Sequence, residues 1–185
     1  MSKLIYSMSM SLDGFIYGPD GNFDWGAPDE ELHRFHNEQV RKLGGHLLGR
    51  RLYETMKYWE TAKKDPAATD YALEFAEIWT ALPKVVFSHT LDEVVGNTRL
   101  AQRGIAEEVA ELQDRSGKDV AIGGADLAAE AIRLGLVDDF QLFFYPVVVG
   151  GGKPFFPSID QILHLNLVET QTFASRVVYI RYVLA

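Results

Sequence analysis

One apolar strand turns directly into a helix in the segment Val120-Ala121-Ile122-Gly123-Gly124-Ala125-Asp126-Leu127. Residues 120–122 are short, apolar and partly β-branched, which is typical of an interior strand. Apolar residues then recur at helical spacing as far as Leu134, and Gly135 follows at the point where helices commonly end. The segment therefore predicts a strand, a turn without side chains and a helix.

The two glycines of this turn have two possible roles. Without side chains they let a ligand approach the backbone, and the free N–H groups and positive dipole end of the following helix suit a phosphate. The alternative is a tight turn that needs a positive φ or close packing. The turn alone favours neither role, so the assignment depends on the rest of the chain.

The overall composition is that of one folded protein domain. The 185 residues, 47% of them hydrophobic and 24% charged, can form a sizeable core, so we expect a single domain over residues 1–185. A net charge of −8 disfavours nucleic acid as a partner, and the lack of cysteine excludes disulfides and thiolate chemistry. No apolar run is long enough to cross a membrane and no signal peptide is visible, so we expect a cytoplasmic protein.

Strands and helices alternate along the chain. We expect strands at residues 4–10, 46–49, 84–88, 120–122 and 140–149, a loop at 13–25, and helices that begin near residues 28, 51, 70, 103 and 125. The last two strands, 165–172 and 177–184, predict a hairpin. This order predicts an α/β fold with a mixed, mainly parallel central sheet, helices on both faces and a C-terminal hairpin.

Three strand ends carry groups that suit a phosphorylated ligand. Gly49, Arg50 and Arg51 follow one strand, Ser88 and His89 follow the next, and the two glycines follow a third. The carboxyl ends of parallel strands meet at one edge of an open α/β sheet, where ligands bind. An arginine pair suits a 2′-phosphate because guanidinium binds phosphate in a bidentate fork. The alternative for the arginines is a solvated helix start with surface salt bridges.

Four segments, in this order along the chain, resemble the dihydrofolate reductase-like superfamily. They are residues 11–16 (SLDGFI), 48–54 (LGRRLYE), 122–124 (IGG) and 148–157 (VVGGGKPFFP). The resemblance is strongest to the family of the C-terminal reductase domain of RibD, a bifunctional enzyme of riboflavin biosynthesis. It implies a three-layer α/β/α sandwich, an NADPH-dependent reductase and a homodimer.

The resemblance also implies the positions of a cofactor site. Ser9 and Ile16 would flank the nicotinamide; Gly49, Arg50 and Arg51 would bind the adenosine-side phosphates; Ser88 and His89 would lie near the 2′-phosphate; and Gly123, Gly124, Ala125, Asp126 and Leu127 would cover the pyrophosphate. The family often joins its two glycines by a cis peptide bond, which we expect between Gly123 and Gly124. Ala125 replaces a glycine common in the family, and Asp126 places a negative charge beside the pyrophosphate, which should weaken binding unless the carboxylate points away.

An acidic helix start supplies the candidates for the catalytic residue. The pattern Trp25-x-x-Pro28 before it resembles the folate reductases, in which a helix carboxylate binds the pterin and aids its protonation. Asp29 suits a helix cap, and Glu31 borders the apolar stripe of the helix whereas Glu30 faces away, so we select Glu31, although the spacing from Pro28 fits Glu30 as well. The favoured alternative is that all three acids complement the helix dipole.

Asp13 and Trp25 are the candidate substrate-binding residues. An aspartate before a glycine commonly forms a turn, which is the alternative for Asp13. His33 and His36 could share a metal on one helix face, but no third ligand is evident, so we expect surface histidines and no metal.

These observations predict an NADPH-dependent oxidoreductase that acts on a small heterocyclic molecule. The first candidate is a 5-amino-6-(5-phosphoribosylamino)uracil-type reductase of riboflavin biosynthesis, and the enzymatic alternative is a dihydrofolate reductase. An alternative of another class is a non-catalytic protein that binds NADPH or a small ligand. Apolar residues on both faces of the segment 140–149 and of the terminal strands predict a homodimer through this part of the sheet.

Overall fold

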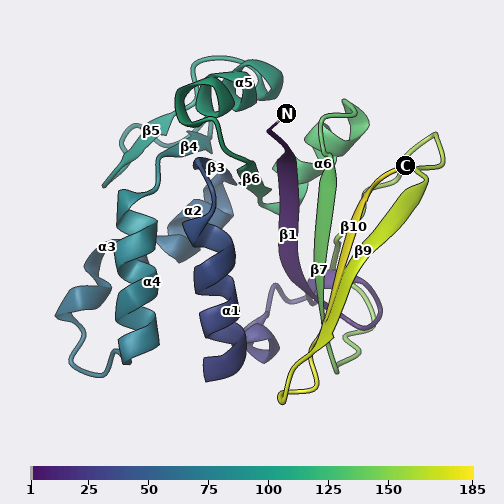
Figure 1. The fold of residues 1–185 in the computed structure, drawn as a ribbon, viewed down its shortest axis with the longest axis horizontal. Helices are drawn as coiled ribbons and strands as arrows, with labels where there is room; N and C mark the ends of the chain where they lie inside the picture. Colours follow the sequence, from purple (N-terminus) through teal and green to yellow (C-terminus); the bar gives the residue numbers. More distant parts are fainter. Residues whose placement is uncertain (1) are drawn as a thin grey trace.

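The computed structural model describes residues 2–185, and in them eight strands form one central sheet (Figure 1). The strands are β1 (Leu4–Ser11), β3 (Gly45–Gly49), β4 (Lys84–Phe87), β5 (Thr98–Leu100), β6 (Val120–Gly123), β7 (Asp139–Tyr145), β9 (Leu165–Thr172) and β10 (Val178–Leu184). They lie in the order β5-β4-β3-β6-β1-β7-β10-β9, in which every pair from β5 to β7 is parallel and β10 is antiparallel to both its neighbours. The predicted mixed, mainly parallel sheet and the terminal hairpin are confirmed.

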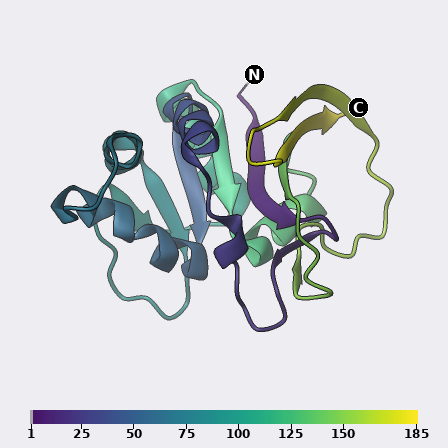
Figure 2. The same ribbon diagram turned by 90° about the horizontal axis from the view of Figure 1, so that it is seen from below.

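Helices cover both faces of the sheet, which confirms the three-layer prediction. They are α1 (Glu30–Arg41), α2 (Arg50–Met56), α3 (Tyr58–Thr61), α4 (Asp70–Ala81), α5 (Ile105–Ser116) and α6 (Ala125–Arg133). Successive side chains of a strand point to opposite faces of the sheet, as two adjacent residues of β3 show. Leu47 packs in the cluster that contains α5 and α6, and Leu48 packs in the cluster beneath α4. Figure 2 shows α1 and α6 on opposite sides of the sheet.

Two apolar clusters on the α1 side leave the middle of that face open. One gathers Leu32 of α1 with β7 and β10, and the other lies beneath α4. Between them the sheet presents the small residues Ser7 and Ser9 of β1 and Ala121 of β6, because the larger residues of these strands point to the opposite face. The sequence thus leaves a hollow between α1 and the sheet.

The structure differs from the sequence predictions at two places near this hollow. The predicted loop at 13–25 contains a short strand, β2 (Phe15–Tyr17), that pairs with β8 (Lys153–Pro154). The sequence does not predict these strands, because two or three residues are too few to show a hydrophobic period. Their pairing depends on residues 150–152, which are all glycines at positive φ and turn the chain back toward β2. Every peptide bond in residues 2–185 is trans, so the predicted cis bond between Gly123 and Gly124 is wrong.

Other features of the chain follow the sequence more closely. Asp29 caps α1 by accepting a hydrogen bond from the backbone nitrogen of Leu32 at 3.0 Å, as its position predicts. None of the helices in residues 2–185 is long and apolar enough to cross a membrane.

Candidate functional site

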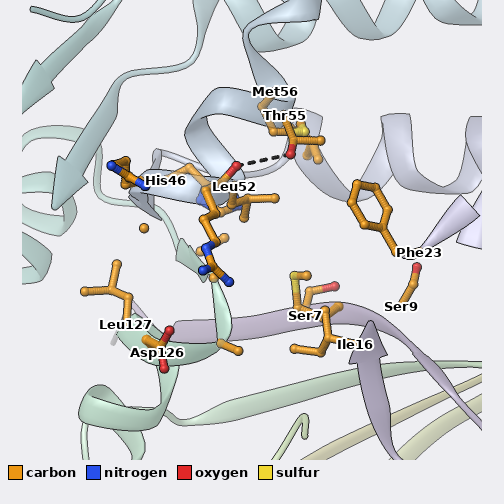
Figure 3. A pocket seen from close by; sticks show the side chains of 18 of the residues that line it. Ser7, Ser9, Ile16, Phe23, His46, Leu52, Thr55, Met56, Asp126 and Leu127 are labelled. Atoms are coloured by element: carbon orange, nitrogen blue, oxygen red, sulfur yellow. Dashed lines mark hydrogen bonds between the residues drawn. The ribbon is translucent and has the colours of Figure 1, made fainter. Parts of the chain in front are cut away.

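A single cavity of about 1070 Å³ runs from the carboxyl edge of the parallel strands to the space beneath α1 (Figure 3). Ligand pockets commonly measure roughly 300–1,000 Å³, so this one has room for a large ligand or for two ligands side by side. Its walls come from the ends of β1, β3 and β4, from β2, from the faces of α1 and α2, and from the first turn of α6. The outer end and the inner end differ in chemistry.

Two glycines shape the outer end. Gly124, at φ +94°, precedes α6, and a Cβ placed on it would lie 3.3 Å from the backbone nitrogen and Cα of Gly49. The turn after β6 and the turn after β3 therefore approach each other backbone to backbone. Gly49, Gly124, Ala125, Asp126 and Leu127 all line the cavity, whereas Gly123 is buried at the end of β6 and does not.

The predicted phosphate-binding side chains meet at this same edge. Arg50, Arg51, Ser88 and His89 all line the cavity. Arg50 donates to Oγ1 of Thr90 at 2.9 Å, and Arg51 donates to the hydroxyl of Tyr17 at 3.0 Å across from β2. The partner of Arg51 is a neutral hydroxyl, and the only carboxylate near Arg50 in residues 2–185 is that of Glu54, 3.8 Å from Nε in an exposed i,i+4 pair. Such exposed pairs are weak, so both guanidinium groups can still bind an anion.

Lys153 changes the electrostatics around Asp126. Its ammonium pairs with the Asp126 carboxylate in the first turn of α6. The negative charge that would oppose a pyrophosphate here is therefore balanced by a cation from the first residue of β8, directly after the glycine-rich loop at 150–152. Sequence reasoning assigned that loop only a bend, and the pairing of β2 with β8 is what brings Lys153 to α6.

Gln102 and Arg103 line the outer end as well, although the sequence did not indicate them. They follow β5, whose three residues have no recognisable strand pattern. Their position is fixed by Glu108 of α5, a fully buried carboxylate that accepts the backbone nitrogens of Gln102 at 2.9 Å and Arg103 at 3.1 Å. Burial alone would raise the pKa of Glu108, but these bonds and the Arg99 guanidinium outweigh it and lower the pKa.

The middle of the cavity contains the residues expected beside a nicotinamide and a substrate. Ser9 of β1, Ile16 of β2 and Trp25 all line it. Figure 3 shows Ser9 and Phe23 at one side of the cavity and His46 at the other, with Ser7 and Ile16 between them. The Trp25 indole packs against Tyr145 with ring centroids 5.8 Å apart, and its N–H is buried without a partner in the described chain.

The inner end of the cavity is polar, and none of the described residues that line it carries a formal charge. It is lined by Ser7, His36, Gln39, His46 and Gln141, and we call it the inner chamber. Burial, and then the neighbouring His33, lower the pKa of His36 to about 4. Burial also lowers the pKa of His46 to about 4. Both imidazoles are therefore neutral near pH 7.

The prediction that His33 and His36 are surface residues is wrong. His33 is 9% exposed and its Nδ1 lies 3.0 Å from Oδ1 of Asn37, while His36 lines the cavity beneath α1. Polar residues on a helix usually indicate its solvent-exposed face, which is why the sequence predicts surface positions for the two histidines. Here the inner face of α1 covers a hollow as well as packed core, and residues that face a hollow can be polar.

The three acids at the start of α1 do not line the cavity. Asp29 caps the helix, Glu30 pairs with Arg34, and Glu31 accepts the backbone nitrogen of Ala174 at 2.9 Å in the turn between β9 and β10. Asp13 lies outside the cavity too: its carboxylate accepts the backbone nitrogens of Val149 and Gly150, which fits the turn-forming alternative.

This placement predicts that Glu31→Gln leaves turnover with NADPH nearly unchanged. The amide oxygen can still accept from Ala174, so the free energy of unfolding should fall by less than about 1 kcal/mol. Glu30→Gln serves as the matched control, because its carboxylate faces Arg34 at the surface. Steady-state kinetics and urea denaturation measure both effects. A large loss of kcat in Glu31→Gln alone would instead restore Glu31 as a catalytic residue.

Comparison with known proteins assigns this architecture to a family. Residues 2–179 match the RibD C-terminal domain family. The chain is a RibD C-terminal domain. The family's members are reductases, and the DHFR-like architecture predicted from the sequence is confirmed.

Individual proteins resemble this RibD C-terminal domain in sequence or in fold. The uncharacterized protein YyaP of Bacillus subtilis (strain 168) is 35% identical over 97% of this chain and 94% of its own length. A candidate riboflavin biosynthesis protein from Shewanella sp. PV-4 superposes with a TM-score of 0.76 at 19% identity over 99% of both chains. Dihydrofolate reductase from Enterococcus faecalis, in complex with NADP(H), superposes with a TM-score of 0.64 at 16% identity over 98% of this chain and 96% of that one.

Proposed function

We propose that this RibD C-terminal domain is an NADPH-dependent reductase that transfers hydride to a small heterocyclic substrate. The observation that supports it is the division of one cavity into two ends. Cationic side chains and exposed backbone amides gather at the sheet edge, and neutral polar groups line the end beneath α1. A phosphorylated cofactor at the first end and a small substrate at the second fit this division.

The residues at the outer end fit the phosphates of NADPH. The Gly49–Gly124 approach leaves a cradle that a single Cβ would narrow, and the first turn of α6 directs free amides into it. Arg50, Arg51 and Ser88 would hold the 2′-phosphate, and Lys153 offsets the charge of Asp126 beside the pyrophosphate.

The residues in the middle of the cavity would orient the reaction. NADPH, when bound, supplies the hydride. Ser9 and Ile16 would position its ring, and Trp25 would close the cavity toward solvent. With pKa values of about 4, His36 and His46 are neutral at pH 7, so they bind and orient a substrate as neutral imidazoles and do not act as cationic acids.

Two substrates and one non-catalytic role follow from the family and the site. The pyrimidine 5-amino-6-(5-phosphoribosylamino)uracil is the first candidate, on the family assignment. Dihydrofolate is the second, because Trp25 and Pro28 both line the cavity at the start of α1. A protein that binds NADPH and reduces neither compound would fit the non-catalytic role or another substrate.

The cofactor proposal predicts tighter binding of NADPH than of NADH. Loss of one charged phosphate contact costs roughly 1.5–3 kcal/mol of binding free energy. Arg50→Ala and Arg51→Ala should therefore each lower the affinity for NADPH about tenfold or more and change the affinity for NADH little. Quenching of intrinsic tryptophan fluorescence measures both affinities. Arg34→Ala is the control, because Arg34 lies on the outer side of α1 and pairs with Glu30 and Asp70. Equal affinity of the unmutated protein for both cofactors would refute the 2′-phosphate assignment.

We also propose a homodimer through the C-terminal hairpin. β7 is covered on both faces, because all its residues except Phe144 are buried. β9 is an edge strand that leaves Leu167 59% and Val168 50% exposed. Light scattering at micromolar concentration should give about twice the 20.8 kDa of one chain. The double variant Leu167→Lys/Val168→Lys should shift the mass toward that of a monomer. A monomeric mass for the unmutated protein would contradict the proposal.

A further inference from the structure

The charged residues that line the cavity all belong to its outer end. In the described chain they are Arg50 and Arg51 after β3, Arg103 after β5, and Asp126 and Glu130 on α6. These are the elements proposed to hold the cofactor. A substrate in the inner chamber therefore meets none of these charges once the cofactor is bound.

Gln141 lines the inner chamber. It is 4% exposed and lies beside Ser7 in the β1–β7 register. Its carboxamide can therefore hydrogen-bond to a ligand or a water in the cavity. A carboxamide offers a donor and an acceptor side by side, which complements the N–H and C=O edge of a lactam.

The two histidines offer further neutral contacts. Nδ1 of His46 lies 3.0 Å from the carbonyl oxygen of Leu47, which can only accept, so Nδ1 holds the proton and Nε2 remains an acceptor. The His36 ring lies 4.5 Å from the Phe143 ring, centroid to centroid, and has no hydrogen-bond partner in residues 2–185. Phe143 is 1% exposed and packs behind the His36 ring, so it forms part of the apolar wall of the cavity.

The two cations nearest the inner chamber are already paired. Arg181 lies beside Gln141 in the β7–β10 register, but its guanidinium donates to both oxygens of Asp139, at 2.6 Å and 2.9 Å to Oδ2. Lys84, near His46, donates to the carbonyl oxygens of Trp79 and Leu82 at 2.6 Å and 2.9 Å and pairs with Glu60. A phosphate or carboxylate moved into the chamber would lose its hydration without gaining a free cation.

We propose that the inner chamber takes an uncharged heterocycle with a lactam edge, bound at Gln141, and rejects substrates with a phosphate or carboxylate at that end. This inference rests on the proposed function and narrows its substrate class: it disfavours the phosphorylated pyrimidine that the family assignment puts first and favours an unphosphorylated heterocycle. It sets this protein apart from a reductase of a ribose phosphate, because the ribose phosphate finds no cation beneath α1.

Calorimetric titration of matched pairs tests the proposal. The probes are uracil and orotate, pterin and pterin-6-carboxylate, and 5-amino-6-ribosylaminouracil and its 5′-phosphate, each added to the free protein and to the NADP⁺-saturated protein. At least one uncharged member should bind, and its anionic counterpart should bind at least tenfold more weakly. Gln141→Leu should lower the affinity for the uncharged ligand at least tenfold and leave the affinity for NADPH unchanged. Gln161→Leu, at an exposed residue outside the cavity, serves as the surface control.

The outcomes separate this proposal from the cofactor proposal. Equal or tighter binding of the anionic members, or no binding of any uncharged member, would overturn the neutral-substrate assignment even if NADPH binds as expected. Unchanged binding of the uncharged ligand in Gln141→Leu would overturn the role of Gln141. Failure of NADPH itself to bind, measured in the same series, would overturn the proposed function, and the titrations of the free protein would still decide the chemistry of the chamber.

Discussion

Replacing Gly124 with alanine is expected to weaken NADPH binding by tenfold or more. At φ +94° an L-residue is strained by about 1–2 kcal/mol, and its Cβ would lie 3.3 Å from the backbone of Gly49. The turn after β6 would have to move away from the turn after β3, and the cofactor phosphates are proposed to bind between these turns. Fluorescence titration with NADPH measures the change.

Gly135→Ala is the matched control for this experiment. Gly135 also has a positive φ, of +67°, but a Cβ there meets no atom within 4 Å and the residue lies outside the cavity. It should lose a similar amount of stability and keep its NADPH affinity. Equal NADPH affinities for the two variants would show that the close approach at Gly124 serves packing alone.

Replacing Glu108 with leucine is expected to lower the free energy of unfolding by about 3 kcal/mol. The fully buried carboxylate bonds to Arg99 and to two backbone nitrogens. In the variant both backbone nitrogens lose their partner, and of its carboxylate partners in residues 2–185 Arg99 keeps only Glu111. NADPH affinity should fall as well, because Gln102 and Arg103 line the outer end of the cavity and are held by those backbone bonds. Urea denaturation and NADPH titration measure the two effects.

Glu111→Gln separates charge pairing from backbone positioning. Glu111 pairs with Arg99, Arg103 and Arg115 but accepts none of the backbone nitrogens that Glu108 holds. It should cost less stability than Glu108→Leu and leave NADPH affinity nearly intact. A loss of NADPH affinity as large in Glu111→Gln as in Glu108→Leu would show that the ion pairs alone matter.

The sequence predicted those elements whose defining residues lie next to one another in the chain. Residues 120–127 contain a strand, a turn and a helix start within eight positions, and the structure has β6 and α6 at these places. The hairpin of β9 and β10 was predicted because two strand-like segments, 165–172 and 177–184, are separated by a short turn at Ala174-Ser175. β2, β5 and β8 were missed, because two or three residues cannot display a period and their pairing depends on partners distant in the chain.

The same distinction applies to the candidate site. The outer end was predicted because each contributing residue directly follows a strand, and parallel strands bring their ends together. The inner chamber was not predicted, because Gln141 and His36 come from a strand and a helix about 100 positions apart, and each alone looks like an ordinary core or surface residue. Likewise, the pairing of Asp126 with Lys153 depends on the small β2–β8 sheet.

A crystal structure of the protein with bound NADPH tests the central claim most directly. The account predicts the 2′-phosphate beside Arg50, Arg51 and Ser88, the pyrophosphate across Gly49 and Gly124, and the nicotinamide between Ser9 and Ile16 with one face open to the inner chamber. A nucleotide bound outside this cavity, or bound in it with the nicotinamide among the arginines, would contradict the account.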